Sequence, residues 1–91
     1  MRSRFLAALP ALGGILVPQA AIAVDLVNED NVAYQVRIVD ESGEREVIIT
    51  PRETLVDICY RCEISIEDVG TISAEPTDTI IIQNGEMSII S

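Results

Sequence analysis

Short stretches of alternating apolar and polar residues occur through most of the chain after residue 23, and this alternation is typical of half-buried β-strands. It is clearest over residues 33–39, whose apolar side chains on one face are Tyr34, Val36 and Ile38. A second, β-branched stretch covers residues 45–50. The turn-forming sequence Asp-Glu-Ser-Gly-Glu at residues 40–44 separates the two stretches, so we predict an antiparallel hairpin.

The register of this hairpin follows if Ser42 and Gly43 lie at its tip. The pairs on the apolar face are then Val36 with Ile49 and Ile38 with Val47. The same register places Asp40 opposite Arg45, and opposite charges in such a position attract each other. The hydrophobic and charge patterns therefore predict the same register.

Residues 55–59 and 62–67 are predicted as two further strands, and in the second the inward side chains are Cys62, Ile64 and Ile66. A two-residue turn between these strands would place the charged Asp57 opposite Ile64 on the apolar face. A bulge or a longer turn around residues 60–61 would remove this conflict, and the sequence favours neither.

Residues 71–74 are predicted as a short strand, and residues 79–83 and 86–90 as a hairpin. Asn84-Gly85 separates the last two, and this dipeptide is the strongest short-range signal for a tight hairpin turn. The pairs that follow are Ile82 with Met87 and Ile80 with Ile89. No stretch after residue 23 has a sustained helical period. We therefore predict an all-β domain, a small antiparallel sandwich or open barrel of about six to seven short strands.

The first 23 residues have another pattern and predict a signal-peptide helix. Arg2 and Arg4 precede a mainly apolar stretch at residues 5–17, which is shorter than the roughly 20 residues that span a membrane. Ala21 and Ala23 occupy the small-residue positions before a signal peptidase cut, which predicts cleavage between Ala23 and Val24. The alternative is a membrane anchor that is retained. Cleavage leaves residues 24–91 as one small acidic β domain in the periplasm or outside the cell.

The charge of this domain limits its partners. Residues 24–91 contain four arginines, fifteen acidic residues and no lysine, which gives a formal charge of −11. Such a charge repels phosphate backbones and anionic lipid headgroups, so we expect no binding to nucleic acid or, after cleavage, to membranes. The charge suits solubility, cations or basic partners.

Cys59 and Cys62 are the two cysteines of the chain. Export would place them where disulfides persist, and their spacing lets a turn bring the thiols together, so we predict a structural disulfide. The chain-entropy model gives such a small loop about 2 kcal/mol of stabilisation. One alternative is a redox-active pair activated by the Arg61 cation, although thioredoxin-like pairs open a helix. The other is a metal site, but zinc needs two further ligands and the chain has no histidine.

Other chemistry has less support in the sequence. The acidic pairs Glu29-Asp30, Asp40-Glu41 and Glu67-Asp68 lack the regular spacing of calcium loops and lie at predicted turns. The absence of histidine removes the Ser/His and Cys/His arrangements of nucleophilic catalysis. We therefore predict no enzyme activity, no catalytic residue, no cofactor and no metal site.

Three strands carry apolar side chains on both faces, at residues 47–49, 80–82 and 89–90. One face of each strand covers the core, and the other is either covered by another layer or exposed. An exposed face or edge of this kind marks self-association or strand addition by a partner. We therefore expect a protein partner or a homo-oligomer through exposed strands.

The last 40 or so residues resemble a group of small uncharacterised exported proteins of alphaproteobacteria. The resemblance rests on the Cys-x-x-Cys with the alternating strand after it, on Val69-Gly70, and on the hairpin of residues 78–85. It implies export and a small β domain, and it implies no activity. The sequence favours a structural or interaction module, and the alternative is a periplasmic thiol-redox or metal-handling accessory protein that uses the Cys59/Cys62 pair.

Overall fold

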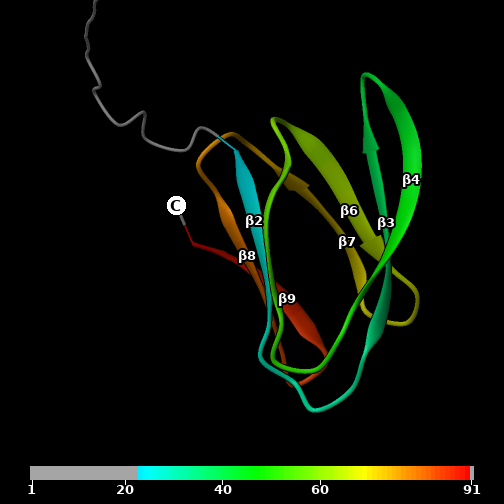
Figure 1. The fold of residues 1–91 in the computed structure, drawn as a ribbon, viewed down its shortest axis with the longest axis vertical. Helices are drawn as coiled ribbons and strands as arrows, with labels where there is room; N and C mark the ends of the chain where they lie inside the picture. Colours follow the sequence, from blue (N-terminus) through cyan, green and yellow to red (C-terminus); the bar gives the residue numbers. More distant parts are fainter. Residues whose placement is uncertain (1–22, 91) are drawn as a thin grey trace, which may run out of the picture.

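The computed structural model describes residues 23–90, which form two four-stranded β-sheets packed face to face (Figure 1). The strands are β2 (Val24–Asn28), β3 (Tyr34–Asp40), β4 (Gly43–Ile49), β5 (Thr54–Cys59), β6 (Cys62–Ile66), β7 (Gly70–Ala74), β8 (Thr79–Gln83) and β9 (Glu86–Ile90). The predicted all-β sandwich is therefore confirmed, with eight strands in the described residues instead of six to seven. The additional strand is β2.

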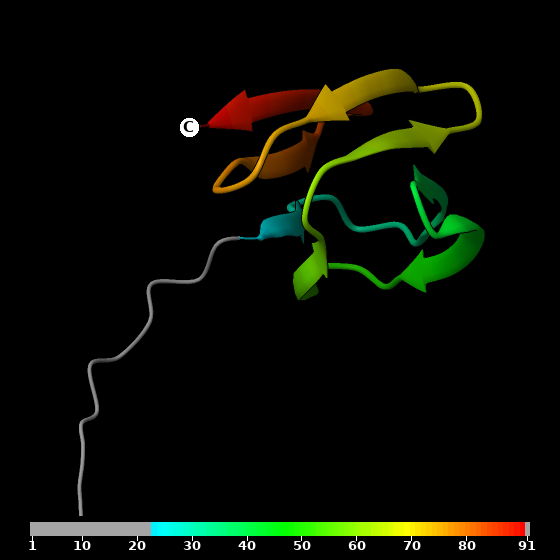
Figure 2. The ribbon, with the colours of Figure 1, turned by 90° about the horizontal axis from the view of Figure 1, so that it is seen from above.

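Sheet 1 has the strand order β5-β2-β8-β9, and sheet 2 has the order β4-β3-β6-β7. All pairs in the described residues are antiparallel except β2 and β8, which place Leu26 beside Ile80 in a parallel register. Parallel neighbours need a long connection, and here the chain between them forms β3 to β7. Figure 2 shows the two layers from above, with β9 and β7 close together at one rim of the sandwich.

The core lies between the sheets and is built by strand alternation. In β2, β6 and β8 every second side chain is buried, while the residues between them face outward. The apolar side chains that are completely buried are Val24, Leu26, Val36, Ile38, Ile49, Ile64, Ala74, Ile80 and Ile82. Small and β-branched residues therefore supply nearly the whole interior, and the chain after residue 23 contains no Phe or Trp.

The predicted hairpin at the C-terminal end is confirmed in its register. Ile80 pairs with Ile89 and Ile82 with Met87. Asn84 and Gly85 have φ angles of 55° and 72°. Both angles are positive, as the favoured two-residue hairpin turn requires, and Asn and Gly adopt them more readily than other residues.

The hairpin of β3 and β4 is confirmed, but its predicted register is wrong by two residues. Val36 pairs with Val47 and Ile38 with Arg45, because the chain turns at Glu41–Ser42 and not at Ser42–Gly43. A shift of two residues keeps every side chain on its predicted face, so the alternating pattern does not distinguish the two registers. Asp40 is not directly opposite Arg45, yet the two form an ion pair in which Nη1 of Arg45 lies 3.7 Å from Oδ2 of Asp40.

The segments 55–59 and 62–67 do not form a hairpin with each other, which corrects the prediction about their connection. β5 belongs to sheet 1 and β6 to sheet 2, so residues 60–61 carry the chain from one sheet to the other. The conflict between Asp57 and Ile64 therefore never arises. Asp57 instead lies where the β5–β2 pairing is irregular, with a φ of 55°, and its N–H donates to the Asp25 carboxylate.

The predicted signal peptide at residues 1–23, including Ala21, lies outside the described residues except for Ala23. The predicted cut falls between Ala23 and Val24, and Val24 is the first residue of β2 and is completely buried. In the part of the chain that the structure describes, no helix is long and apolar enough to cross a membrane.

Candidate functional site

The predicted disulfide between Cys59 and Cys62 is present, and it connects the two sheets. Cys59 ends β5 in sheet 1 and pairs with Val24, while Cys62 begins β6 in sheet 2 and pairs with Ala74. The two Cα atoms are 6.1 Å apart, and the residues are 8% and 6% exposed. The disulfide therefore fastens the corner at which the chain crosses between the layers.

Arg61, which lies beside this corner, contacts both Glu75 and Tyr60. Its Nε lies 2.8 Å from Oε1 of Glu75, and its guanidinium carbon lies 5.5 Å from the centre of the Tyr60 ring. The hydrogen bond to Glu75 is the main reason why the pKa of Arg61 is raised. The cation that the redox hypothesis assigns to the thiols therefore has a carboxylate partner of its own.

A metal site at the cysteine pair has no further ligands in the structure. Both cysteines of the chain are in the disulfide. Across residues 23–90, no three His, Cys, Asp or Glu side chains are grouped so that they could hold a metal ion.

The Asp30 carboxylate, from the first of the three acidic pairs, is a structural acceptor. Its Oδ1 accepts the N–H of Asn84 at 2.7 Å, and its Oδ2 accepts the N–H of Gly85 at 3.0 Å and the hydroxyl of Tyr34 at 2.7 Å. These bonds, that of Tyr34 first, hold the pKa of Asp30 below its usual value, and the same contact raises the pKa of Tyr34. Asp30 thus ties the loop after β2 to the β8–β9 turn.

The other acidic pairs also lie at turns. Asp40 accepts the N–H of Ser42 at 2.9 Å and pairs with Arg45. Asp68 lies between β6 and β7 with a φ of 67°, a backbone conformation that Asp tolerates better than most residues. The positions of Asp40 and Asp68 are therefore explained by the turns in which they lie.

Asn28 is a buried polar residue that the sequence analysis missed. It is 1% exposed, and its Nδ2 donates to the carbonyl oxygens of Val32 at 2.8 Å and Thr50 at 3.0 Å. Its Oδ1 accepts the N–H of Asp30 at 2.9 Å. The last bond is an Asx-turn, and the sequence signal for it is an Asn at the end of an alternating stretch, because the residue two positions on contributes only its backbone N–H.

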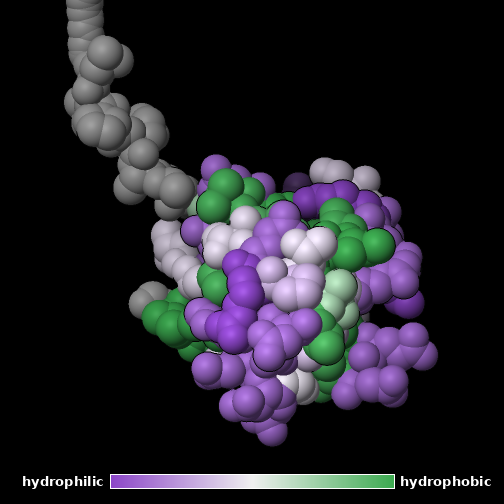
Figure 3. Space-filling model, turned by 60° about the horizontal axis from the view of Figure 1, so that its bottom comes forward, coloured by the Kyte–Doolittle hydropathy of each residue, from purple (hydrophilic) through white to green (hydrophobic). Residues whose placement is uncertain are grey.

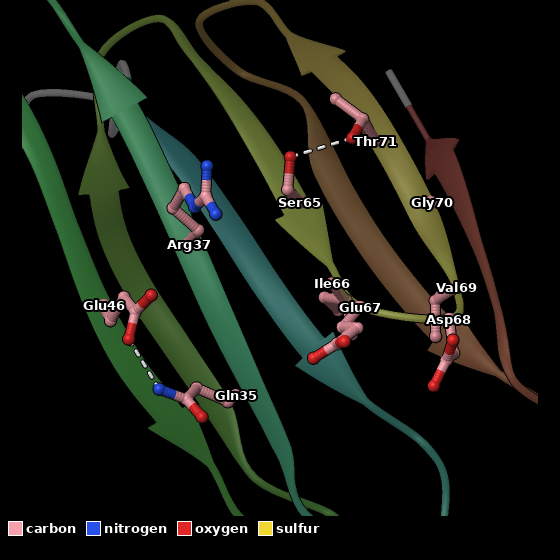
Figure 4. Close-up of a pocket in the computed structure, with 10 residues that line it drawn as sticks. All are labelled: Gln35, Arg37, Glu46, Ser65, Ile66, Glu67, Asp68, Val69, Gly70 and Thr71. Carbon is pink, nitrogen blue, oxygen red and sulfur yellow. Dashed lines mark hydrogen bonds between the residues drawn. The ribbon is translucent and has the colours of Figure 1, made fainter.

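A shallow depression of about 800 Å³ covers part of the outer face of sheet 2 (Figure 4). Its lining is mostly polar and comprises Gln35, Arg37, Glu46, Ser65, Ile66, Glu67, Asp68, Val69, Gly70 and Thr71. The side chains bond one another, Gln35 to Glu46 and Ser65 to Thr71. The lining has neither His nor Cys, and this arrangement presents no activated nucleophile.

Several apolar side chains remain at the surface. This was predicted from the strands that carry apolar side chains on both faces. In β4, Ile49 is buried while Ile48 is 63% exposed, and at the end of β9 Ile89 and Ile90 are 38% and 54% exposed. The other large exposed apolar residues are Val32, Val56 and Tyr60. In Figure 3 such apolar patches lie between larger areas of hydrophilic side chains.

Comparisons of the chain with protein-family models, with curated proteins and with solved structures found no match.

Proposed function

We propose that this protein is an exported structural or interaction module that contacts other protein surfaces through exposed strands and has no catalytic activity. The observation that carries the proposal is the position of the disulfide. It lies at the corner where the chain passes between the sheets, with both cysteines buried. There it contributes stability to a domain whose core is too small to supply much alone.

Export to the periplasm or beyond the cell is part of this proposal. A disulfide persists in an oxidising compartment, and the basic, apolar and small-residue order of residues 1–23 is that of a signal peptide. The resemblance of the last 40 or so residues to small exported proteins of alphaproteobacteria agrees with this. A signal peptidase cut before Val24 leaves the first strand of the fold intact.

The site chemistry favours a structural role over the redox or metal-handling alternative. A redox pair needs an accessible, low-pKa thiol. Here both cysteines are more than nine-tenths buried, and the neighbouring Arg61 is paired with Glu75. Binding a metal through the cysteines first requires reduction of their bond.

The test uses protein recovered from the periplasm after expression of the full chain. We expect no bound metal by elemental analysis and no acceleration of thiol–disulfide exchange in a misoxidised protein substrate. The matched variant, with Cys59→Ser and Cys62→Ser, is expected to give the same rate as the wild type. A wild-type acceleration that this variant loses, or stoichiometric metal, would overturn the proposal.

A further inference from the structure

The four edge strands of the sandwich differ in how well they are protected against pairing with another chain. Edge strands are usually protected by charged side chains, by bulges or by cover from other elements. β4 carries Glu44, Arg45 and Glu46, and β5 contains the irregularity at Asp57. β9 is regularly paired with β8 and has Glu86 as its one charged residue. β9 is therefore an unprotected edge.

The backbone groups that β9 presents to solvent follow from its pairing with β8. In an antiparallel ladder, residues alternate between those that bond the neighbouring strand and those that point away from it. The two-residue turn closes with the pair Gln83–Glu86, so Ser88 also bonds toward β8. The N–H and C=O groups of Met87 and Ile89 therefore point toward the open side.

The side chains of Met87 and Ile89 belong to the inner face of sheet 1, because they pair with the buried Ile82 and Ile80. At the rim they are only partly covered, and Ile89 is 38% exposed. The neighbouring edge strand β7 contains no charged residue. The rim formed by β7 and β9 is therefore nearly uncharged on a molecule whose residues 24–91 carry a formal charge of −11.

We propose that β9 pairs antiparallel with β9 of a second copy, about a two-fold axis at Ser88. This register sets Met87 opposite Ile89 of the second copy and uses all four outward-pointing groups of each strand. A register centred on Met87 sets Ile89 opposite Gly85 of the turn and so leaves half of these groups unpaired, and one centred on Ile89 sets Met87 opposite residue 91, outside the described strand. The inference rests on the proposed interaction role and names its partner, a second copy of this chain.

The scarcity of charge on β9 itself favours a second copy over a basic partner at this edge. In this register Glu86 lies opposite Ile90 of the other copy, and the two Glu86 residues are four positions apart, about 13 Å. That distance exceeds the Debye length of about 8 Å at physiological ionic strength. β9 offers a basic partner one carboxylate, that of Glu86. It offers a second copy apolar side chains and backbone hydrogen-bonding groups that match its own.

Cysteine crosslinking tests the register. The two Ser88 residues form a pair without mutual backbone hydrogen bonds, with Cα atoms about 4.5 Å apart, which a disulfide can span. With diamide as the oxidant of the two thiols, the periplasmic Ser88→Cys protein is expected to become mostly a covalent dimer. The matched variant Ile90→Cys lies on the same outward face, but its two thiols are about 13 Å apart, so only background crosslinking is expected.

Sedimentation of the wild type is the second measurement. One strand on each side buries less than a standard interface, so we expect a reversible dimer that forms between about 10 µM and about 1 mM. Salt should increase its fraction, since it screens the repulsion between two acidic molecules. A monomer throughout this range, or equal crosslinking at positions 88 and 90, would overturn the inference. Neither result depends on metal content or exchange activity, so a failure here is distinguishable from a failure of the proposed function.

Discussion

Asn28 and Asp30 show how two short polar side chains hold four separate segments together. Asn28 is buried and connects the end of β2 to the carbonyl oxygens of Val32 and Thr50. Asp30 extends this connection to the β8–β9 turn and to Tyr34. A buried polar group costs free energy unless its hydrogen bonds are made, and the amide of Asn28 bonds through both its nitrogen and its oxygen.

We expect Asp30→Asn to lower the melting temperature at pH 7, because an amide cannot accept all three hydrogen bonds. Folding lowers the pKa of Asp30 from its ordinary value of 3.8. The ionised Asp30 carboxylate therefore contributes its full stabilisation of the fold above pH 3.8, and this stabilisation is lost as the pH falls through the folded-state pKa. The difference in melting temperature between wild type and variant should narrow below pH 3.8.

The matched control for this prediction is Glu29→Gln, which removes one carboxylate charge at the neighbouring, exposed position. General charge repulsion affects both variants equally, so the difference between them isolates the hydrogen bonds of Asp30. Equal melting temperatures for the two variants at pH 7, or a gap that persists unchanged to pH 2, would contradict this role.

At the scale of elements, alternation predicted the positions of seven strands but missed β2, and pairing was predictable only where a turn fixed it. Asn84-Gly85 permits one tight turn, and its register was right. The turn of β3 and β4 has several residues suited to its tip, and slipping by two leaves the same side chains inside, so the register was wrong. β5 and β6 are separated by two residues, as in a hairpin, and the alternation contains no sign that the chain changes sheets.

The same limit applies to the candidate site. Export and cysteine spacing predicted the disulfide, but its role as a connection between the sheets depends on strand order. Asp30 receives bonds from residues 54 and 55 positions away along the chain, and no local pattern indicates such contacts.

We expect the double substitution Cys59→Ser and Cys62→Ser to lower the free energy of unfolding by about 2 kcal/mol, as the chain-entropy model gives for a loop of this size. Urea unfolding of the variant and of the wild type measures this difference. The wild type kept in a strong thiol reductant serves as the control and should unfold like the variant. If both substitutions leave the unfolding midpoint unchanged, the disulfide does not stabilise the fold.

At the scale of the whole molecule, burial of a small aliphatic core stabilises the fold, while repulsion within a strongly acidic surface destabilises it. The ion pairs of the described residues use Arg37, Arg45 and Arg61, each with one acidic partner. Most of the fifteen acidic residues therefore have no cation beside them. Their mutual repulsion opposes the compact state, and salt screens it.

We expect the melting temperature at pH 7 to rise as sodium chloride increases from 10 mM to 100 mM, because the Debye length falls from about 30 Å to about 10 Å. A variant with Glu63→Gln and Glu67→Gln, both at exposed positions, should melt higher at low salt and respond less to added salt. A melting temperature that does not change with salt would show that repulsion does not limit stability.

The reduction potential of the Cys59–Cys62 disulfide tests most directly whether this protein is a structural module. Structural disulfides have potentials below about −300 mV, whereas catalytic and labile ones lie higher. Equilibration of the folded protein in dithiol redox buffers, with the two states separated by mass after thiol alkylation, gives the value. Because both cysteines are buried at the corner between the sheets, we expect a potential below about −300 mV. A potential near −150 mV, with rapid exchange toward a protein thiol, would contradict the structural role and favour a redox function.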